Sequence, residues 1–186
     1  MNRVIETERL ILRPWQKTDA DINAIVAGFS DFDTIKMLTI PFPYTKEDAL
    51  TFIDERENDD ENSYYFAITI KESGKVIGGT TLSINRENNT NSGGIWLDKN
   101  YQGFGYGTEA WTARANFAFF ELGLDRLYNG YFEFNEVSPK MQQKIGYKIV
   151  GSQERFCPAL GGLVKEIRTV LTREDFISKM GLKIKK

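Results

Sequence analysis

The start of the chain switches from a strand-like to a helical pattern of hydrophobic positions. The stretch from Arg9 to Arg13, in which charged and apolar residues interchange, predicts a short strand that stops at Pro14. The next segment, Thr18–Asp21, has the form of a capping box and therefore predicts the start of a helix. The apolar residues that follow at helical spacing are Ile22, Ile25, Val26 and Phe29.

Two further helices are predicted before the first pair of strands. A short helical piece is expected around Thr34–Leu38, ahead of an irregular segment, Pro41–Tyr44, where each proline disfavours helix in the residue before it. A second capping signal, Thr45–Asp48, predicts a helix that ends near Asn58. The acidic residues that follow would be unfavourable at the negative end of the helix dipole.

Strand-forming residues dominate the next segment. Tyr64–Ile70 and Val76–Ile84 are rich in aromatic and β-branched residues and flank a glycine-containing turn, so together they predict an antiparallel hairpin. Asn85–Ser92 is polar and is predicted to be a turn. Gly93–Leu97 is then predicted to be a short fourth strand.

The clearest helical signal lies at Thr108–Leu122. Its apolar residues form two adjacent stripes, which implies packing on a sheet, and Gly123 is suited to end the helix. The elements predicted after it are a strand at Arg126–Phe134, a helix at Pro139–Ile145 ended by Gly146, strands at Tyr147–Gln153 and Val164–Thr172, and a helix from about Glu174. No repeat or linker interrupts this order. We therefore expect one mixed α/β domain over residues 1–186, with a basic tail from about residue 181.

Composition narrows the function by exclusion. The 24 basic and 26 acidic residues give a net charge of −2, which argues against a non-specific nucleic-acid binder. The chain has no histidine, so Ser-His-Asp and Cys-His catalysis and histidine-bound zinc are excluded, and no metal site is expected. Cys157 is the single cysteine, so no intramolecular disulfide can form. No apolar run approaches a membrane span and the acidic start lacks a signal-peptide pattern, so we expect a cytoplasmic protein without membrane contact.

A glycine-rich segment joins the strand predicted at Gly93–Leu97 to the long helix. Gly103, Gly105 and Gly107 stand at alternate positions, where they let backbone N–H groups turn inward without obstruction by side chains. The helix N-terminus adds partial positive charge, so the segment is suited to hold a phosphate or pyrophosphate. Thr108 stands where a Rossmann fingerprint needs its third glycine, and the lysine of a Walker A loop is missing. A nucleotide-binding domain of either class is therefore disfavoured.

The motif Gln-x-x-Gly-x-Gly, formed by Gln102, Gly105 and Gly107, resembles motif A of the GNAT N-acetyltransferases. Asn135-x-x-Ser138, followed by Lys144-Ile145-Gly146-Tyr147, is similar to the next motif of that family. The segments that resemble its RimJ/RimL-like branch, which acetylates ribosomal proteins, are Thr7–Pro14, Thr108–Ala110 and Leu171–Phe176. These signals follow one another in the family's order over nearly the whole chain, which is identified through them as a GNAT member.

The resemblance implies both a fold and a donor substrate. The implied fold is a strongly twisted mixed β-sheet of about seven strands, with helices on both faces and acetyl-CoA between the splayed fourth and fifth strands. The pantetheine arm would lie against Ile95–Leu97 and Asn135, and the pyrophosphate would lie at Gln102–Thr108. Lys140 and Lys144 either reach the phosphates or are simply solvated. The full set assigned to the donor is Ile95, Trp96, Leu97, Gln102, Gly103, Phe104, Gly105, Tyr106, Gly107, Thr108, Asn135, Lys140 and Lys144.

The reaction that the resemblance implies is direct attack of a primary amine on the acetyl thioester. The amine must lose a proton, the oxyanion needs a donor such as a backbone N–H of Ile95–Leu97, and the departing thiolate needs a proton. Ser138 is the candidate for that last proton, while Ser before Pro also has the form of a helix N-cap, and the two roles are compatible. Glu133 is a candidate base, with Asp98 or a chain of waters as alternatives. Cys157 is expected to be an ordinary thiol, without a role as nucleophile.

The acceptor stays open at this stage. A protein N-terminus or a small amine is implied, and the acidic run Asp54–Glu61 either attracts a cationic acceptor or forms a solvated helix end. A non-catalytic module that binds acyl-CoA is the alternative function. Nucleic acid is not an expected partner, and the chain is expected to be a monomer or a homodimer.

Overall fold

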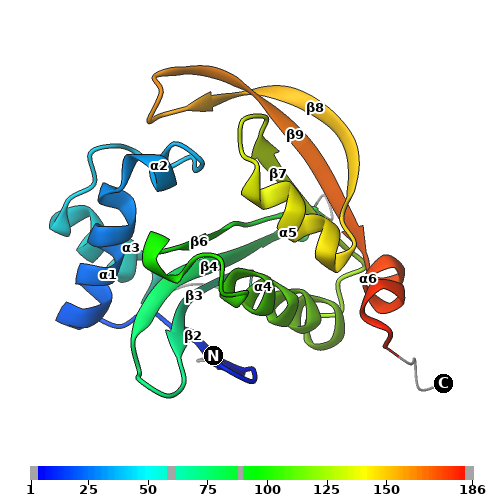
Figure 1. Ribbon diagram of the computed structural model, residues 1–186, viewed down its shortest axis with the longest axis horizontal. Coiled ribbons are helices and arrows are strands. Elements are labelled where there is room, and N and C mark those ends of the chain that lie inside the picture. Colours follow the sequence, from blue (N-terminus) through cyan, green and yellow to red (C-terminus); the bar gives the residue numbers. More distant parts are fainter. Residues whose placement is uncertain (1–3, 58–61, 88–89, 183–186) are drawn as a thin grey trace.

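The strands divide into two sheets, shown in Figure 1 for the computed structural model, which describes residues 4–57, 62–87 and 90–182. The strands are β1 Ile5–Glu6, β2 Leu10–Pro14, β3 Ser63–Ile70, β4 Val76–Asn85, β5 Thr90–Ser92, β6 Ile95–Leu97, β7 Arg126–Phe132, β8 Lys148–Cys157 and β9 Gly162–Thr172. The larger sheet has the order β1-β2-β3-β4, with β5 and β6 both paired to β4. The smaller sheet has the order β7-β9-β8.

Helices cover both faces of the larger sheet, as expected. The helices are α1 Asp19–Ser30, α2 Phe32–Ile35, α3 Lys46–Glu57, the 3-10 turn η1 Lys99–Tyr101, α4 Tyr106–Asn116 with its π-helical continuation η2 Phe117–Glu121, α5 Val137–Ile145 and α6 Arg173–Met180. Neighbouring residues of β3 alternate between the two faces. Ala67 packs with the apolar residues of α1 and α3, whereas Phe66 and Ile68 pack with Ala110 and Phe117 on the α4 side.

The first helices begin where their capping signals predict. Thr18 Oγ1 accepts the N–H of Asp21 (3.3 Å), and α1 starts at Asp19. Thr45 and Asp48 form a reciprocal capping box at the start of α3, which is described as far as Glu57, so the predicted end at Asn58 lies outside the described residues. The short helix expected at 34–38 lies instead at 32–35, because the Asp31 carboxylate caps it two residues earlier.

Several predicted boundaries move because tertiary pairing extends or shortens an element. β8 and β9 pair as far as Cys157 with Gly162, so both strands are longer than their sequence patterns indicate. β7 ends at Phe132, two residues before the predicted end. Both α4 and α5 start two residues before the predicted positions, at Tyr106 and Val137.

The segment 85–92 is not simply a turn. Its last residues form β5, which pairs with β4 in the register Ser83 with Ser92 and Ile84 with Asn91. Asn and Ser have low strand propensity, so the sequence gives little indication of this strand. The pairing is set by β4, whose long apolar run provides a partner strand.

Each pairing in the described residues is antiparallel, whereas a mixed sheet was expected. A parallel pair needs a crossover connection such as a helix, and β6 and β7 are the strands that α4 connects. These two strands diverge and belong to different sheets, so the pair that would have made the sheet mixed is not hydrogen-bonded. This divergence agrees with the splayed fourth and fifth strands that the sequence implies.

A side chain joins the two sheets where the divergence begins. Asn91 in β5 donates through Nδ2 to the carbonyl of Arg126 (2.7 Å) and accepts through Oδ1 from the N–H of Tyr128 (2.9 Å). The side-chain amide thereby replaces one pair of backbone hydrogen bonds between β5 and β7. At the far end, the long β8–β9 hairpin arches over the gap towards α2 (Figure 1). The Cys157 thiol there contacts the carbonyl of Lys36 (3.5 Å).

Candidate active site

The free edge of β6 follows from the alternation of its backbone groups. The Asp98 N–H donates to the carbonyl of Ile77 (2.9 Å), and the Gly94 carbonyl accepts from Thr81 (3.0 Å), so residues 94, 96 and 98 face β4. Ile95 and Leu97 consequently direct their backbone groups away from β4. Within the described ranges no strand pairs with that edge. It therefore presents backbone donors and acceptors to the gap between β6 and β7.

Trp96 lies differently from its neighbours. Its backbone groups face β4, and its ring stacks on Trp15 (centroids 6.3 Å apart, planes at 4°) and packs against Phe29 (4.8 Å). A Cβ on Gly28 would lie 2.1 Å from this ring, so α1 approaches β6 closely because residue 28 has no side chain. Trp96 fixes α1 on the sheet, and only Ile95 and Leu97 of the predicted donor strand lie at the free edge.

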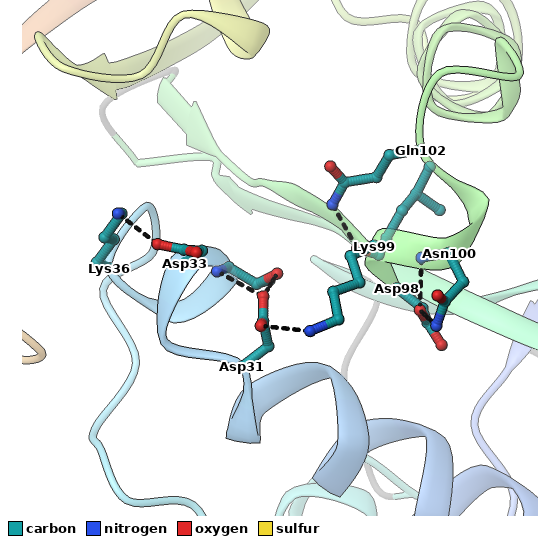
Figure 2. Close-up of polar contacts among 9 residues, drawn as sticks. Asp31, Asp33, Lys36, Asp98, Lys99, Asn100 and Gln102 are labelled. Atoms are coloured by element: carbon teal, nitrogen blue, oxygen red, sulfur yellow. Dashed lines mark hydrogen bonds and ion pairs between the residues drawn. The ribbon is translucent and has the colours of Figure 1, made fainter.

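The glycine-rich loop continues from this edge. Gln102 donates through Nε2 to the carbonyl of Leu97 (2.9 Å), as Figure 2 shows, so its side chain ties the loop to β6. Gly103 and Gly105 both have φ +85, a conformation that other residues rarely adopt. The first helical hydrogen bond of α4 runs from the N–H of Glu109 to the carbonyl of Gly105. The N–H groups of residues 106–108 therefore precede the hydrogen-bonded helix, the arrangement that binds phosphate at helix N-termini.

Two other loop residues have distinct surroundings. The Phe104 side chain is 63% exposed and leaves the loop open to solvent. Gly107 is enclosed, because a Cβ there would lie 3.2 Å from Met141 Sδ and 3.4 Å from Leu97 Cδ1. Gly107 thus allows α5 and β6 to pack against the first turn of α4.

Two motifs that lie a hundred residues apart in the sequence meet beneath this loop. The Glu109 carboxylate accepts hydrogen bonds from Thr7 Oγ1 (2.6 Å), the Arg9 N–H (2.9 Å) and Arg9 Nε (2.7 Å). Burial alone would raise the pKa of Glu109, but the hydrogen bonds from Thr7 and Arg9 outweigh it, so the pKa lies below its ordinary value. Both motifs are recognisable in the sequence, but their contact depends on the fold.

The residues of the second motif lie at the start of α5. Asn135 Oδ1 accepts from the N–H groups of Val137 (3.1 Å) and Ser138 (2.9 Å), so Asn135 caps the helix. Ser138 is the second helical residue, so the expectation that it forms the N-cap is wrong. The backbone N–H of Asn135 donates to the carbonyl of Phe132 (2.8 Å), so its side-chain N–H groups and its own carbonyl are left for any contact with a donor.

Ser138 is held from inside the protein. Gln142, 2% exposed, donates through Nε2 to Ser138 Oγ (3.1 Å), and Thr169 in β9 donates to Gln142 Oε1 (2.6 Å). Because of these two hydrogen bonds, Ser138 Oγ accepts from Gln142, and its hydroxyl hydrogen is available for another group. Neither Gln142 nor Thr169 was predicted as a site residue, because their contact joins α5 to β9, which are separated in the sequence.

The carboxylates proposed as bases have other partners. Glu133, one residue beyond β7, is 53% exposed and lies 3.5 Å from Lys165 Nζ. Asp98 caps η1 by accepting from the N–H (2.8 Å) and Nδ2 (2.9 Å) of Asn100 (Figure 2).

The remaining predicted charges are peripheral. Lys140 and Lys144 are exposed on α5. Asp54, at the start of the acidic run, pairs with Lys17, and residues 58–61 of that run lie outside the described residues. The described residues contain no group of three acidic or thiol side chains suited to hold a metal ion.

An ion pair joins the segment after β6 to the start of α2. Lys99 Nζ lies 3.1 Å from Asp31 Oδ1, and the same carboxylate caps α2 through Thr34 (Figure 2). Hydrogen bonds from Thr34 and Lys99 lower the pKa of Asp31.

No helix in the described segments is both long and apolar enough to cross a membrane.

Comparison with known proteins agrees with this geometry. The sequence profile of the acetyltransferase (GNAT) domain matches residues 9–148. The uncharacterized N-acetyltransferase p20 of Bacillus licheniformis is 26% identical over 174 residues, which cover 91% of this chain and 96% of the relative. A putative ribosomal-protein-serine acetyltransferase from Vibrio cholerae is 25% identical and superposes with a TM-score of 0.76 over 91% of this chain and 97% of its own.

A third protein resembles the fold and carries the donor. The microcin C7 self-immunity acetyltransferase MccE, crystallised with acetyl-CoA and AMP, is 20% identical and has a TM-score of 0.76 over 89% of this chain and 93% of its own. The Vibrio cholerae protein, a putative ribosomal-protein acetyltransferase by its title, is consistent with the RimJ/RimL-like branch. The chain therefore belongs to the GNAT acetyltransferase family and is an N-acetyltransferase that uses acetyl-CoA as its acyl donor.

Proposed function

We propose that this enzyme acetylates a primary amine by direct attack on the thioester of acetyl-CoA bound in the gap between β6 and β7. The observation that carries the proposal is the continuity of the free edge at Ile95 and Leu97 with the loop Gln102–Thr108. An extended arm that hydrogen-bonds to the edge would deliver its pyrophosphate to the start of α4. The N–H groups of residues 106–108 and the helix dipole favour an anion at that point.

The reaction needs no covalent enzyme intermediate. The amine nitrogen attacks the thioester carbonyl, a backbone N–H of Ile95 or Leu97 stabilises the oxyanion, and the C–S bond then breaks. Ser138 supplies a proton or a hydrogen bond to the departing thiolate, because its hydroxyl hydrogen is not used by Gln142. The carboxylates of Glu133 and Asp98 have other partners, which favours removal of the amine proton through water.

The acceptor that we propose is the α-amine of a protein N-terminus. The Vibrio cholerae relative, by its name, acts on a ribosomal protein, which supports this class. An α-ammonium has a pKa of about 8, against about 10.4 for a lysine side chain, so less base assistance is needed. A small amine such as a polyamine is the second candidate class.

The experiment is to follow free CoA release from acetyl-CoA with three acceptors: peptides with free N-termini, the same peptides blocked at the N-terminus, and polyamines. Turnover with free but not blocked peptides supports the proposal. Turnover with polyamines alone would contradict the proposed acceptor class, while the proposed acetyl transfer to a primary amine would stand. Tight binding of acetyl-CoA without turnover on any amine would favour a non-catalytic acyl-CoA-binding module.

A further inference from the structure

We propose that Arg9 is a positioning residue of the glycine loop and acts on acetyl-CoA through the carbonyl of Phe104. Arg9 Nη1 donates to this carbonyl (3.0 Å), although the two residues lie 95 positions apart in the sequence. The inference rests on the proposed placement of the pyrophosphate at this loop. It assigns a part in donor binding to an N-terminal segment that the sequence connects to the family by resemblance alone.

The rigid peptide between Phe104 and Gly105 explains why this hydrogen bond matters. In a trans peptide the C=O and the following N–H point in opposite directions within one plane. Arg9 holds the Phe104 carbonyl towards β2, so the N–H of Gly105 is directed to the other side of the loop, away from Arg9. Glycines at 103 and 105 with φ +85 give this segment wide conformational freedom, so an external contact is needed to select one orientation.

The guanidinium of Arg9 is itself fixed on three sides. Nε and Nη2 both lie 2.7 Å from Glu109 Oε2, and the group stacks 4.5 Å from the centroid of the Tyr106 ring. Glu109 belongs to the first turn of α4, so Arg9 connects the loop carbonyl to the helix that follows it. The side chain is nevertheless 42% exposed, so its place is fixed by these contacts and not by burial.

These contacts favour positioning of the loop by Arg9 over direct electrostatic attraction between Arg9 and the pyrophosphate. Nε and Nη2 face the Glu109 carboxylate, which neutralises the charge, and Nη1 donates to the carbonyl of Phe104. Arg9 therefore contributes a forked geometry, which a lysine ammonium cannot reproduce because it is a single point of charge. A positive charge at position 9 without the forked guanidinium should therefore not be enough to position the loop.

The experiment compares two acyl donors in the Arg9→Lys variant. Acetyl-CoA carries the pyrophosphate, whereas S-acetylpantetheine carries the same thioester and arm without it. We expect the KM for acetyl-CoA to rise about tenfold, the effect of one lost charge-assisted hydrogen bond. The KM for S-acetylpantetheine and the kcat with either donor stay close to wild type. The 3′-dephospho form of acetyl-CoA, which keeps the pyrophosphate, shows the same rise as acetyl-CoA.

Arg13→Lys provides a matched control. Arg13 lies in β2 and forms a two-pronged pair with Asp21 (2.8 Å for each bond), on the α1 side of the sheet. Its substitution tests the loss of an arginine–carboxylate fork far from the loop. We expect the ratio of kcat/KM for the two donors to stay within about twofold of wild type in this variant.

The possible outcomes distinguish this proposal from the placement of the pyrophosphate. If wild type prefers acetyl-CoA strongly and Arg9→Lys keeps that preference, Arg9 does not position the loop. An equal loss with both donors would indicate a general structural role and also overturns the proposal. If wild type itself shows no preference for acetyl-CoA over S-acetylpantetheine, the placement of the pyrophosphate at the loop fails as well.

Discussion

Gln142 donates a hydrogen bond to Ser138 from one turn further along α5, so the Ser138 oxygen acts as an acceptor towards the protein interior. The amide is in turn fixed by Thr169, which donates to its oxygen. An oxygen that accepts one hydrogen bond can still donate its own hydrogen outward, and donation to it makes that hydrogen more acidic. Buried and exposed halves of the site are thereby connected through one hydroxyl group.

Replacing Ser138 by alanine separates chemistry from folding. Ser138→Ala should lower stability by about 1–3 kcal/mol, because the buried Nε2 of Gln142 loses its acceptor. It should also lower kcat by roughly a hundredfold through loss of the leaving-group donor, with unchanged affinity for acetyl-CoA. Asn135→Ala should lower the free energy of unfolding by about 0.5–2 kcal/mol. Steady-state kinetics and denaturant unfolding of both variants check this. A fully active Ser138→Ala enzyme would assign the proton to water.

Thr169→Val tests the orientation of Gln142. The substitution keeps the shape but removes the hydroxyl that fixes the amide, so Gln142 can turn its oxygen towards Ser138 and compete for its hydrogen. We expect kcat to fall several-fold, and stability to fall by about 1–3 kcal/mol, because the buried amide group that faces residue 169 has no partner in either orientation. Thr172→Val is a control for loss of a hydroxyl in the same strand, since Thr172 caps α6 instead. Equal kcat in Thr169→Val and wild type would contradict the idea that Thr169 orients Gln142 and, through it, Ser138.

Valine substitutions at Gly105 and Gly107 should have different effects. Gly105 has φ +85 at the open loop, so Gly105→Val distorts the loop and should weaken acetyl-CoA binding. At Gly107 the added side chain meets Met141 and Leu97, so Gly107→Val should mainly lower stability, by about 1–3 kcal/mol from overpacking. Calorimetric titration with acetyl-CoA and thermal unfolding distinguish the two. Identical behaviour of both variants would refute this division.

The stability contributed by Glu109 should depend on pH. Its pKa in the folded protein is depressed, so the ionised carboxylate stabilises the fold above its ordinary pKa of about 4.3. This contribution is lost as the pH falls through the folded-state pKa. The difference in unfolding free energy between wild type and Glu109→Gln should therefore be largest at neutral pH and shrink below about pH 4. Urea unfolding of both proteins at pH 7, 5 and 3.5 measures it, and a constant difference would show that ionisation is not involved.

Cys157→Ala should keep its catalytic activity. The thiol is buried at the tip of the arch, against the carbonyl of Lys36, and direct attack by the amine needs no acetyl-cysteine. We expect sequential two-substrate kinetics with kcat near wild type, and a moderate loss of stability from the removed contact. Ping-pong kinetics together with an acetylated Cys157 in mass spectra would overturn direct transfer.

Local signals in the sequence predicted the parts of the fold that depend on neighbouring residues. The capping residues Thr18 and Thr45, and the glycines of the loop, work within a few positions of the backbone that they shape. The contacts that complete the site are of another kind. Arg9 meets Glu109, and Gln142 meets Thr169, only after strands distant in sequence have paired. A hydrophobic pattern carries no information on such partners, so these contacts had to come from the structure.

Asn91 imposes a constraint on how this sequence can vary. Its amide uses an N–H and an oxygen in opposite roles, to the carbonyl of Arg126 and the N–H of Tyr128. Aspartate would set a carboxylate against that carbonyl, and glutamine would place the same groups one methylene too far out. The residues of a short polar strand near the surface ordinarily tolerate many substitutions. Here we expect position 91 to tolerate fewer substitutions than the apolar residues of β4 beside it, where one aliphatic side chain readily replaces another.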